Sequence, residues 1–103
     1  MPKAIERVQS PGHLAWLDLE MTGLDPQRDV ILQAALIVTD RELRPLEEFA
    51  VDLWQPEEAL AGMVPFVRAM HERTGLLARV RASQVDLVAA ERALLAQIGR
   101  AHV

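Results

Sequence analysis

Residues 14–24 read Leu-Ala-Trp-Leu-Asp-Leu-Glu-Met-Thr-Gly-Leu, an apolar run that ends in two acids and a Thr-Gly pair. A short, β-favouring run bounded by a turn signal is typical of a buried strand, which we predict over residues 14–20. Alternate strand residues share a face, so Asp18 and Glu20 should project together, roughly 7 Å apart. Such carboxylates are costly to desolvate, and a divalent cation with oxygen ligands is the usual compensation. Alternatively, the strand ends at Leu17 and both acids lie in water.

The string Asp18-Leu-Glu-Met-Thr-Gly-Leu-Asp25 resembles the first exonuclease motif of the oligoribonucleases. These are DnaQ-like 3′→5′ exonucleases with an RNase H-like fold, and Met-Thr-Gly-Leu separates this branch from its relatives. The resemblance implies a site of four acidic ligands and a general-base histidine around two Mg²⁺ or Mn²⁺ ions. Asp18 and Glu20 would be two catalytic acids and metal ligands, with Asp18 bridging both ions. Met21, Thr22 and Leu24 would contact the substrate, Leu24 as a wedge between bases.

A second stretch, residues 63–76, resembles the family's next recognisable region. There an aromatic residue lies five positions before a histidine, and a hydroxyl residue, Gly and Leu follow. Phe66 and His71 fit this pattern and would hold the terminal bases, since flat rings stack on any base. Many members have tryptophan in place of Phe66, and the smaller ring should stack more weakly. Alternatively, Phe66 is a core residue and His71 a surface or helix-terminal histidine. Gln33 occupies a position where the family usually has glutamate, and we assign it no role.

Composition places the chain among small folded domains. It has 103 residues, of which 50% are hydrophobic, and no cysteine. It lacks both an apolar stretch of the ~18 residues that a membrane span requires and a signal-peptide pattern, so we expect a cytoplasmic protein that does not bind membranes. Residues 14–60 carry eleven acids against three arginines, whereas residues 66–82 carry four arginines against one acid. This asymmetry suits a small phosphorylated substrate better than a long duplex, unless it is chance surface charge.

The order of the patterns predicts an α/β fold. We expect strands near 14–20, 29–39 and 47–54, the second buried on both faces, in an antiparallel meander. Helices should follow: a short one from Glu57, another from Pro65 to Gly75, and a last one after a capping box at Ser83 that covers one face of the sheet. The resemblance implies a truncated RNase H-like exonuclease fold without its later parallel strands.

The ends of the chain divide it into three parts. Residues 1–13 show no periodicity and should be a loose leader, and residues 14–96 should form the N-terminal part of one exonuclease domain. Residues 97–103 contain the in-frame translation of ATC-GGA-AGA-GCA-CAC-GTC, a common sequencing-library adapter, so we expect a non-native read-through tail. The family's later Gly-Asn-Ser…Asp and His-x-x-x-x-Asp segments are not present in this sequence. We therefore expect a marginally stable, inactive chain in which four sheet residues have too few partners: Val30, Ile31, Ile37 and Val38.

The leading interpretation is the N-terminal part of a 3′→5′ exoribonuclease that degrades very short single-stranded RNAs to mononucleotides. A DnaQ-like DNA exonuclease or proofreading subunit is the second interpretation, although Met-Thr-Gly-Leu argues against it. The third is a metal- or nucleotide-binding fragment without turnover, because ligands are missing. The resemblance also implies that the full-length protein is a homodimer.

Overall fold

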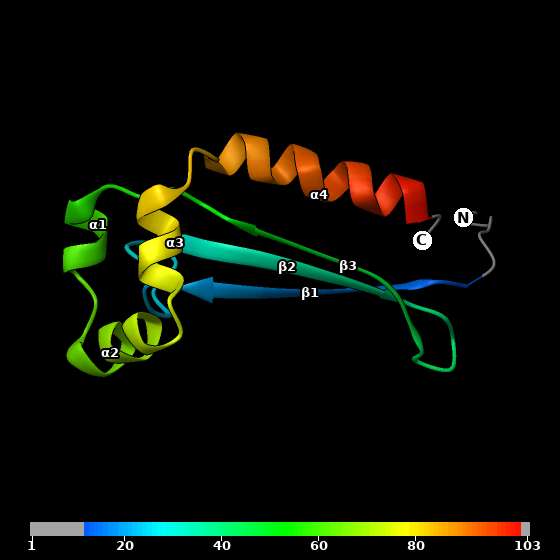
Figure 1. The fold of residues 1–103 in the computed structure, drawn as a ribbon, viewed down its shortest axis with the longest axis horizontal. Helices are drawn as coiled ribbons and strands as arrows, with labels where there is room; N and C mark the ends of the chain where they lie inside the picture. Colours follow the sequence, from blue (N-terminus) through cyan, green and yellow to red (C-terminus); the bar gives the residue numbers. More distant parts are fainter. Residues whose placement is uncertain (1–11, 102–103) are drawn as a thin grey trace.

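The computed structural model describes residues 12–101, which form one antiparallel sheet followed by four helices (Figure 1). The sheet has the strand order β1-β2-β3, and its strands are β1 (Leu14–Met21), β2 (Ile31–Thr39) and β3 (Pro45–Asp52). The helices are α1 (Glu57–Ala61), α2 (Pro65–Arg73), α3 (Leu76–Ala82) and α4 (Leu87–Ala101). The expected α/β meander followed by helices is confirmed. Most of the expected leader, and residues 102–103 of the expected tail, lie outside the described residues.

Strand β1 is an edge strand, and the expectation that it is buried was wrong. Its strand geometry continues past Asp18 and Glu20, so the alternative in which it ends at Leu17 was also wrong. Trp16 is 50% exposed and Leu17 58% exposed. The reason is that β1 pairs with β2 on one side, while α4 packs over β2 and β3 (Figure 1). The sequence pattern records apolarity, whereas burial depends on which elements cover the strand.

Strand β2 is central but buried on one face, which corrects the prediction of burial on both. Its burial alternates along the strand, as expected where helices cover only one side. The buried residues are Leu32, Ala34, Leu36 and Val38. Of the four sheet residues expected to lack partners, Ile37 is exposed, Val30 and Ile31 are half-buried, and Val38 is covered.

The helices begin at recognisable signals, with two differences from the prediction. Pro65 occupies the first turn of α2 as expected, and Gly75 lies in the left-handed region at φ 83°. A third helix, α3, follows Gly75 directly and was missed, because one left-handed glycine joins the two helices without a polar break. The cap of α4 is Asp86 rather than Ser83, since the Ala89 N–H donates to Asp86 Oδ1 at 2.8 Å.

The core consists of two separate clusters. The larger joins β2 to the first three helices through Leu32, Leu60, Met63, Leu76, Leu77 and Val80, with Val67 packed against it. The smaller joins β2 to α4 through Leu36, Val38 and Ala101, flanked by Phe49, Leu94 and Ile98. Residues 97–101 of the expected read-through tail continue α4 and supply part of this contact. Within residues 12–101, no helix is both long and apolar enough to cross a membrane.

Candidate functional site

Asp18 and Glu20 lie on the face of the sheet opposite α4. They pair across to Ala35 and Gln33 of β2, whose side chains alternate with the covered ones. Asp18 is exposed and Glu20 half-buried, and neither side chain has a hydrogen-bond or ion-pair partner among the described residues. By contrast, Glu57 pairs with Arg81 at 2.7 Å, a contact that lowers the pKa of the Glu57 carboxyl. Within residues 12–101, no cationic side chain therefore offsets the charges of Asp18 and Glu20.

The loop that follows β1 is held together by Thr22 and Asp29. The buried Thr22 hydroxyl donates to Asp29 Oδ1 at 2.9 Å and accepts from the Val30 N–H at 3.0 Å. The Asp25 N–H donates to Asp29 Oδ2 at 2.9 Å. That backbone donor, followed by the Thr22 hydroxyl, lowers the pKa of Asp29. The Thr22 hydroxyl is thus fully used inside the loop, so any influence on a ligand passes through the loop's shape.

Gly23 and Leu24, at the tip of this loop, differ in the space around them. A Cβ on Gly23 would stand 2.5 Å from Asp29 Oδ2, so no larger residue fits without moving the carboxylate. Leu24, next along the chain, is 90% exposed. The side chain of Leu24 is therefore accessible to a ligand, and its expected role as a wedge stays a prediction.

His71 connects α2 to the end of β1. It is only 2% exposed, which excludes a surface histidine. Its Nε2 lies 2.9 Å from the Met21 carbonyl oxygen. Because a carbonyl oxygen only accepts, Nε2 carries a proton and donates it to the Met21 carbonyl. His71 therefore fixes the strand end that carries Glu20 while its ring borders the space beside it.

Two adjoining cavities lie between β1 and α2. One, of about 260 Å³, is lined by Glu20, Met21, Leu24 and His71 among others. The other, also about 260 Å³, shares Glu20, Met70 and His71 and adds Gln33, Thr74, Leu76 and Arg79. The structure thus brings together Glu20, Met21, Leu24 and His71 from the expected site. Phe66 is 78% exposed on α2, which excludes a core residue, and it lines neither cavity.

The cavity floor contains residues to which sequence reasoning gave no role. Gln33 Nε2 donates to Asp52 Oδ1 at 2.8 Å, and Arg79 Nε donates to Asp52 Oδ2 at 3.1 Å. A row of polar side chains therefore crosses the sheet from β1 to β3 and reaches α3. The strand register could have revealed the first step, because Gln33 lies directly opposite Glu20.

The donor chemistry fits a divalent cation. Asp18 and Glu20 present hard oxygen ligands on one face, and no cationic side chain of residues 12–101 pairs with them. In the same part of the chain, no group of three or more His, Cys, Asp or Glu side chains could hold a metal ion. The described residues therefore supply a partial oxygen site.

Comparison with known families assigns the class. The exonuclease family RNase_T matches residues 15–102, and the chain belongs to this exonuclease family. The RNase H-like fold follows from this membership, and exonucleases of this family generally use divalent metal ions.

Within the family, the chain is similar to oligoribonucleases. It is 51% identical over 90 residues to the oligoribonuclease of Pseudomonas paraeruginosa, covering 86% of this chain and 50% of that protein. The oligoribonuclease of Azoarcus sp. is 46% identical, and the match covers 85% of this chain and 49% of that protein. The oligoribonuclease of a Mycobacterium species is 47% identical, and the match covers 87% of this chain and 42% of that protein. The chain spans about half the length of these relatives.

Proposed function

We propose that this chain forms the metal- and base-binding part of a 3′→5′ exoribonuclease that degrades very short single-stranded RNAs to mononucleotides. The observation that carries the proposal is that Asp18 and Glu20 share one face of the sheet without a cationic partner among residues 12–101, and that Glu20 lines the cavity bordered by His71 and Leu24. The similarity to oligoribonucleases over 86% of the chain supports RNA as the substrate.

Each residue has a separate task in this proposal. Asp18 and Glu20 would hold Mg²⁺ or Mn²⁺ through their carboxylate oxygens. When bound, the two cations supply hydroxide for attack on the phosphodiester and stabilise the leaving oxygen. Leu24 would separate the two terminal bases, and Phe66 would stack on one of them. His71 holds the Met21 carbonyl and so keeps Glu20 and Leu24 in register with the cavity.

The same set of residues favours binding without turnover for this chain by itself. The described residues provide two of the four acids that the family resemblance implies. We propose that the 103-residue chain binds cation and nucleotide and hydrolyses neither RNA nor DNA, and that the remaining ligands come from family segments outside this sequence. A homodimer and a cytoplasmic location are proposed for the full-length protein by the same resemblance.

Metal binding tests the carboxylate pair. The electron paramagnetic resonance signal of free Mn²⁺, titrated with the chain, gives the dissociation constant. We expect Asp18→Asn and Glu20→Gln each to weaken binding by about tenfold or more, because each removes a charged ligand. Glu48→Gln is the matched control, since Glu48 is exposed on β3 and pairs with Ile37 on the same sheet face. Equal weakening by all three variants would show diffuse charge attraction instead of a site.

Nucleotide binding tests the substrate class. Fluorescence anisotropy with a 5′-labelled diribonucleotide in Mn²⁺ should show saturable binding that is weaker for the matching DNA dinucleotide. Phe66→Ala should weaken RNA binding by about 5- to 150-fold, the range for losing one aromatic stacking contact at ~1–3 kcal/mol. Leu24→Ala should also weaken it, because the apolar contact of the leucine with the bases is lost. Leu46→Ala, an exposed leucine on β3, should have no effect. Preference for DNA would favour the proofreading alternative.

A further inference from the structure

The Gln33 side chain has only one orientation that satisfies its hydrogen bonds. Its neighbour, the Asp52 carboxylate, can only accept, so the amide nitrogen must face Asp52, as observed at 2.8 Å. The carbonyl oxygen, Oε1, therefore points the other way along the amide. Gln33 lines a cavity together with Glu20.

Gln33 and Glu20 are also direct cross-strand partners. They are paired in the β1–β2 register, where side chains of one face stand about 5 Å apart at Cβ. A cation held by the Glu20 carboxylate would lie within reach of an oxygen on the opposite side chain. Amide carbonyl oxygens belong to the ligand types that suit Mg²⁺ and Mn²⁺.

We propose that Gln33 Oε1 is a third, neutral oxygen donor to the cation held by Asp18 and Glu20. This proposal rests on the proposed function, because it presupposes a cation at the two carboxylates. It adds a ligand that a search for acidic and histidine side chains would not reveal.

Asp52 and Arg79 act as positioning residues for this oxygen. Arg79 Nε donates to Asp52 Oδ2 at 3.1 Å, which holds the carboxylate while its other oxygen holds the Gln33 amide. The Arg79 charge also offsets that of Asp52, which leaves Gln33 beside a neutralised pair. A ligand whose amide is already oriented loses less freedom when the cation binds.

An amide–acid exchange tests this proposal by Mn²⁺ titration. Gln33→Met keeps the side-chain length and removes the oxygen, so the dissociation constant should rise about tenfold, in the range for losing an oriented group at a metal site. The double variant Gln33→Glu with Asp52→Asn exchanges amide and acid at unchanged net charge. The amide introduced at position 52 would donate to the carboxylate introduced at position 33 and leave an oxygen of that carboxylate facing Glu20. Binding should then be at least as tight as in the native chain.

Asp52→Asn alone separates positioning from charge. An asparagine can offer either its nitrogen or its oxygen, so the Gln33 amide is free to turn over, and Mn²⁺ binding should weaken about threefold, a small part of the loss from removing the group. Any purely Coulombic part of that loss would persist in a Gln33→Met background, whereas the positioning part would vanish there. Glu48→Gln measures the Coulombic part independently.

The outcomes distinguish this proposal from the proposed function. If Asp18→Asn weakens Mn²⁺ binding and Gln33→Met does not, the carboxylate site stands and the role of Gln33 is wrong. If the native chain binds no Mn²⁺, both are overturned. A merely structural Gln33 would lower the urea unfolding midpoint in Gln33→Met while leaving the Mn²⁺ affinity of the folded fraction unchanged.

Discussion

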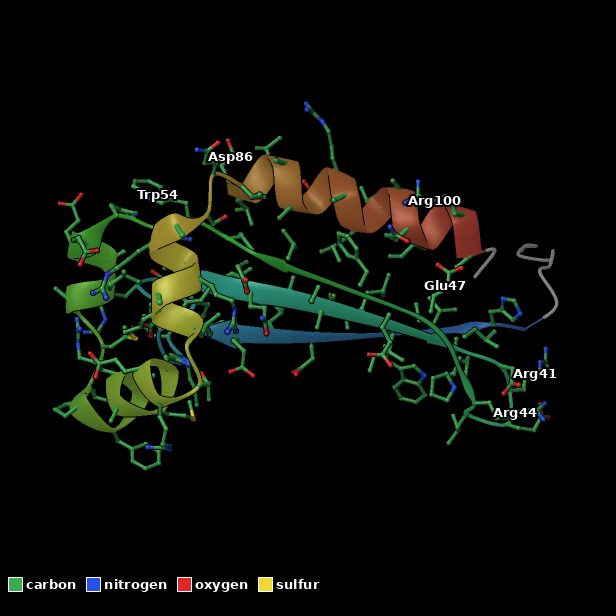
Figure 2. The ribbon with its side chains drawn as sticks, viewed as in Figure 1. Arg41, Arg44, Glu47, Trp54, Asp86 and Arg100 are labelled. Atoms are coloured by element: carbon green, nitrogen blue, oxygen red, sulfur yellow. The ribbon has the colours of Figure 1, made fainter. Side chains whose placement is uncertain are left out.

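The two ends of the sheet differ in how completely they are packed. At the end where β1 finishes, helices α1, α2 and α3 surround the cluster that includes Leu32, Leu60 and Leu77, all essentially inaccessible to solvent (Figure 1). At the opposite end, where Arg41 and Arg44 lie at the β2–β3 turn, α4 alone covers the sheet (Figure 2). Large apolar residues there, Trp16 and Leu17 among them, are half exposed.

This difference in packing matters because only one end of the sheet holds its side chains firmly enough to carry a binding site. The candidate site lies at the well-packed end, where His71 and the Thr22–Asp29 loop are held by hydrogen bonds to other segments. Preorganised ligands require that kind of support. The sparsely covered end carries no part of the site, and its exposed apolar surface adds little to stability.

The largest contrast should appear when one leucine is truncated in each cluster. Leu77→Ala creates a cavity at the packed end and should lower the free energy of unfolding by about 3 kcal/mol. Leu94→Ala, on the half-buried face of α4, should lower it by about 1 kcal/mol, because solvent already reaches the side chain. Urea unfolding followed by circular dichroism measures both. Equal losses would mean that the two ends are packed equally well.

The sequence predicted the elements better than their surroundings. The strand through Asp18 and Glu20 and the helix from Pro65 follow from local patterns of two to four residues, and both are present. The burial of β1 could not be predicted this way, because it depends on which elements lie against the strand. Helix α3 was missed for a local reason, since Gly75 ends one helix and starts the next.

The same limit applies to the site. Asp18, Glu20, Leu24 and His71 could be named from a family resemblance carried by short motifs. Their setting depends on contacts across the chain, since His71 and Met21 are 50 residues apart and Gln33 and Asp52 are 19 apart. Pairing at those separations is decided by register and helix docking, which periodicity does not encode. The sequence therefore named candidate residues for the site, but it did not indicate how they are held or that Gln33 lies beside them.

An intermediate contrast concerns one buried threonine at each end. Thr22→Val removes a hydroxyl that both donates and accepts, which leaves the Val30 N–H without its partner and should cost about 2 kcal/mol. Thr39→Val removes only the acceptor for the Trp16 indole N–H, which is half exposed and can turn to water. That change should cost about 0.5 kcal/mol. Faster hydrogen exchange at Val30 in Thr22→Val would locate the effect in the loop, and an unchanged rate would contradict it.

The smallest individual effects are expected at two left-handed residues outside the strands and helices. Gly75 at the packed end has φ 83°, and Gly75→Ala should lower the free energy of unfolding by about 1 kcal/mol. Leu43, in the turn at the opposite end, has φ 67° with an exposed side chain. Asparagine tolerates this conformation, so Leu43→Asn should raise the free energy of unfolding by about 0.5–1 kcal/mol.

These two substitutions sharpen the comparison because their signs are opposite for one physical cause. A Cβ is unfavourable at positive φ, so adding one at Gly75 costs stability. Asparagine at position 43 keeps a Cβ but offsets part of that cost, because its short polar side chain can hydrogen-bond locally. The gain at Leu43 requires that the turn be formed in the folded chain, where the Leu43 N–H donates to the Asp40 carbonyl at 3.1 Å. If Leu43→Asn leaves the urea midpoint unchanged while Gly75→Ala lowers it, the turn at the sparsely covered end contributes nothing to the cooperative unit, and folding cooperativity resides in the end that carries the site.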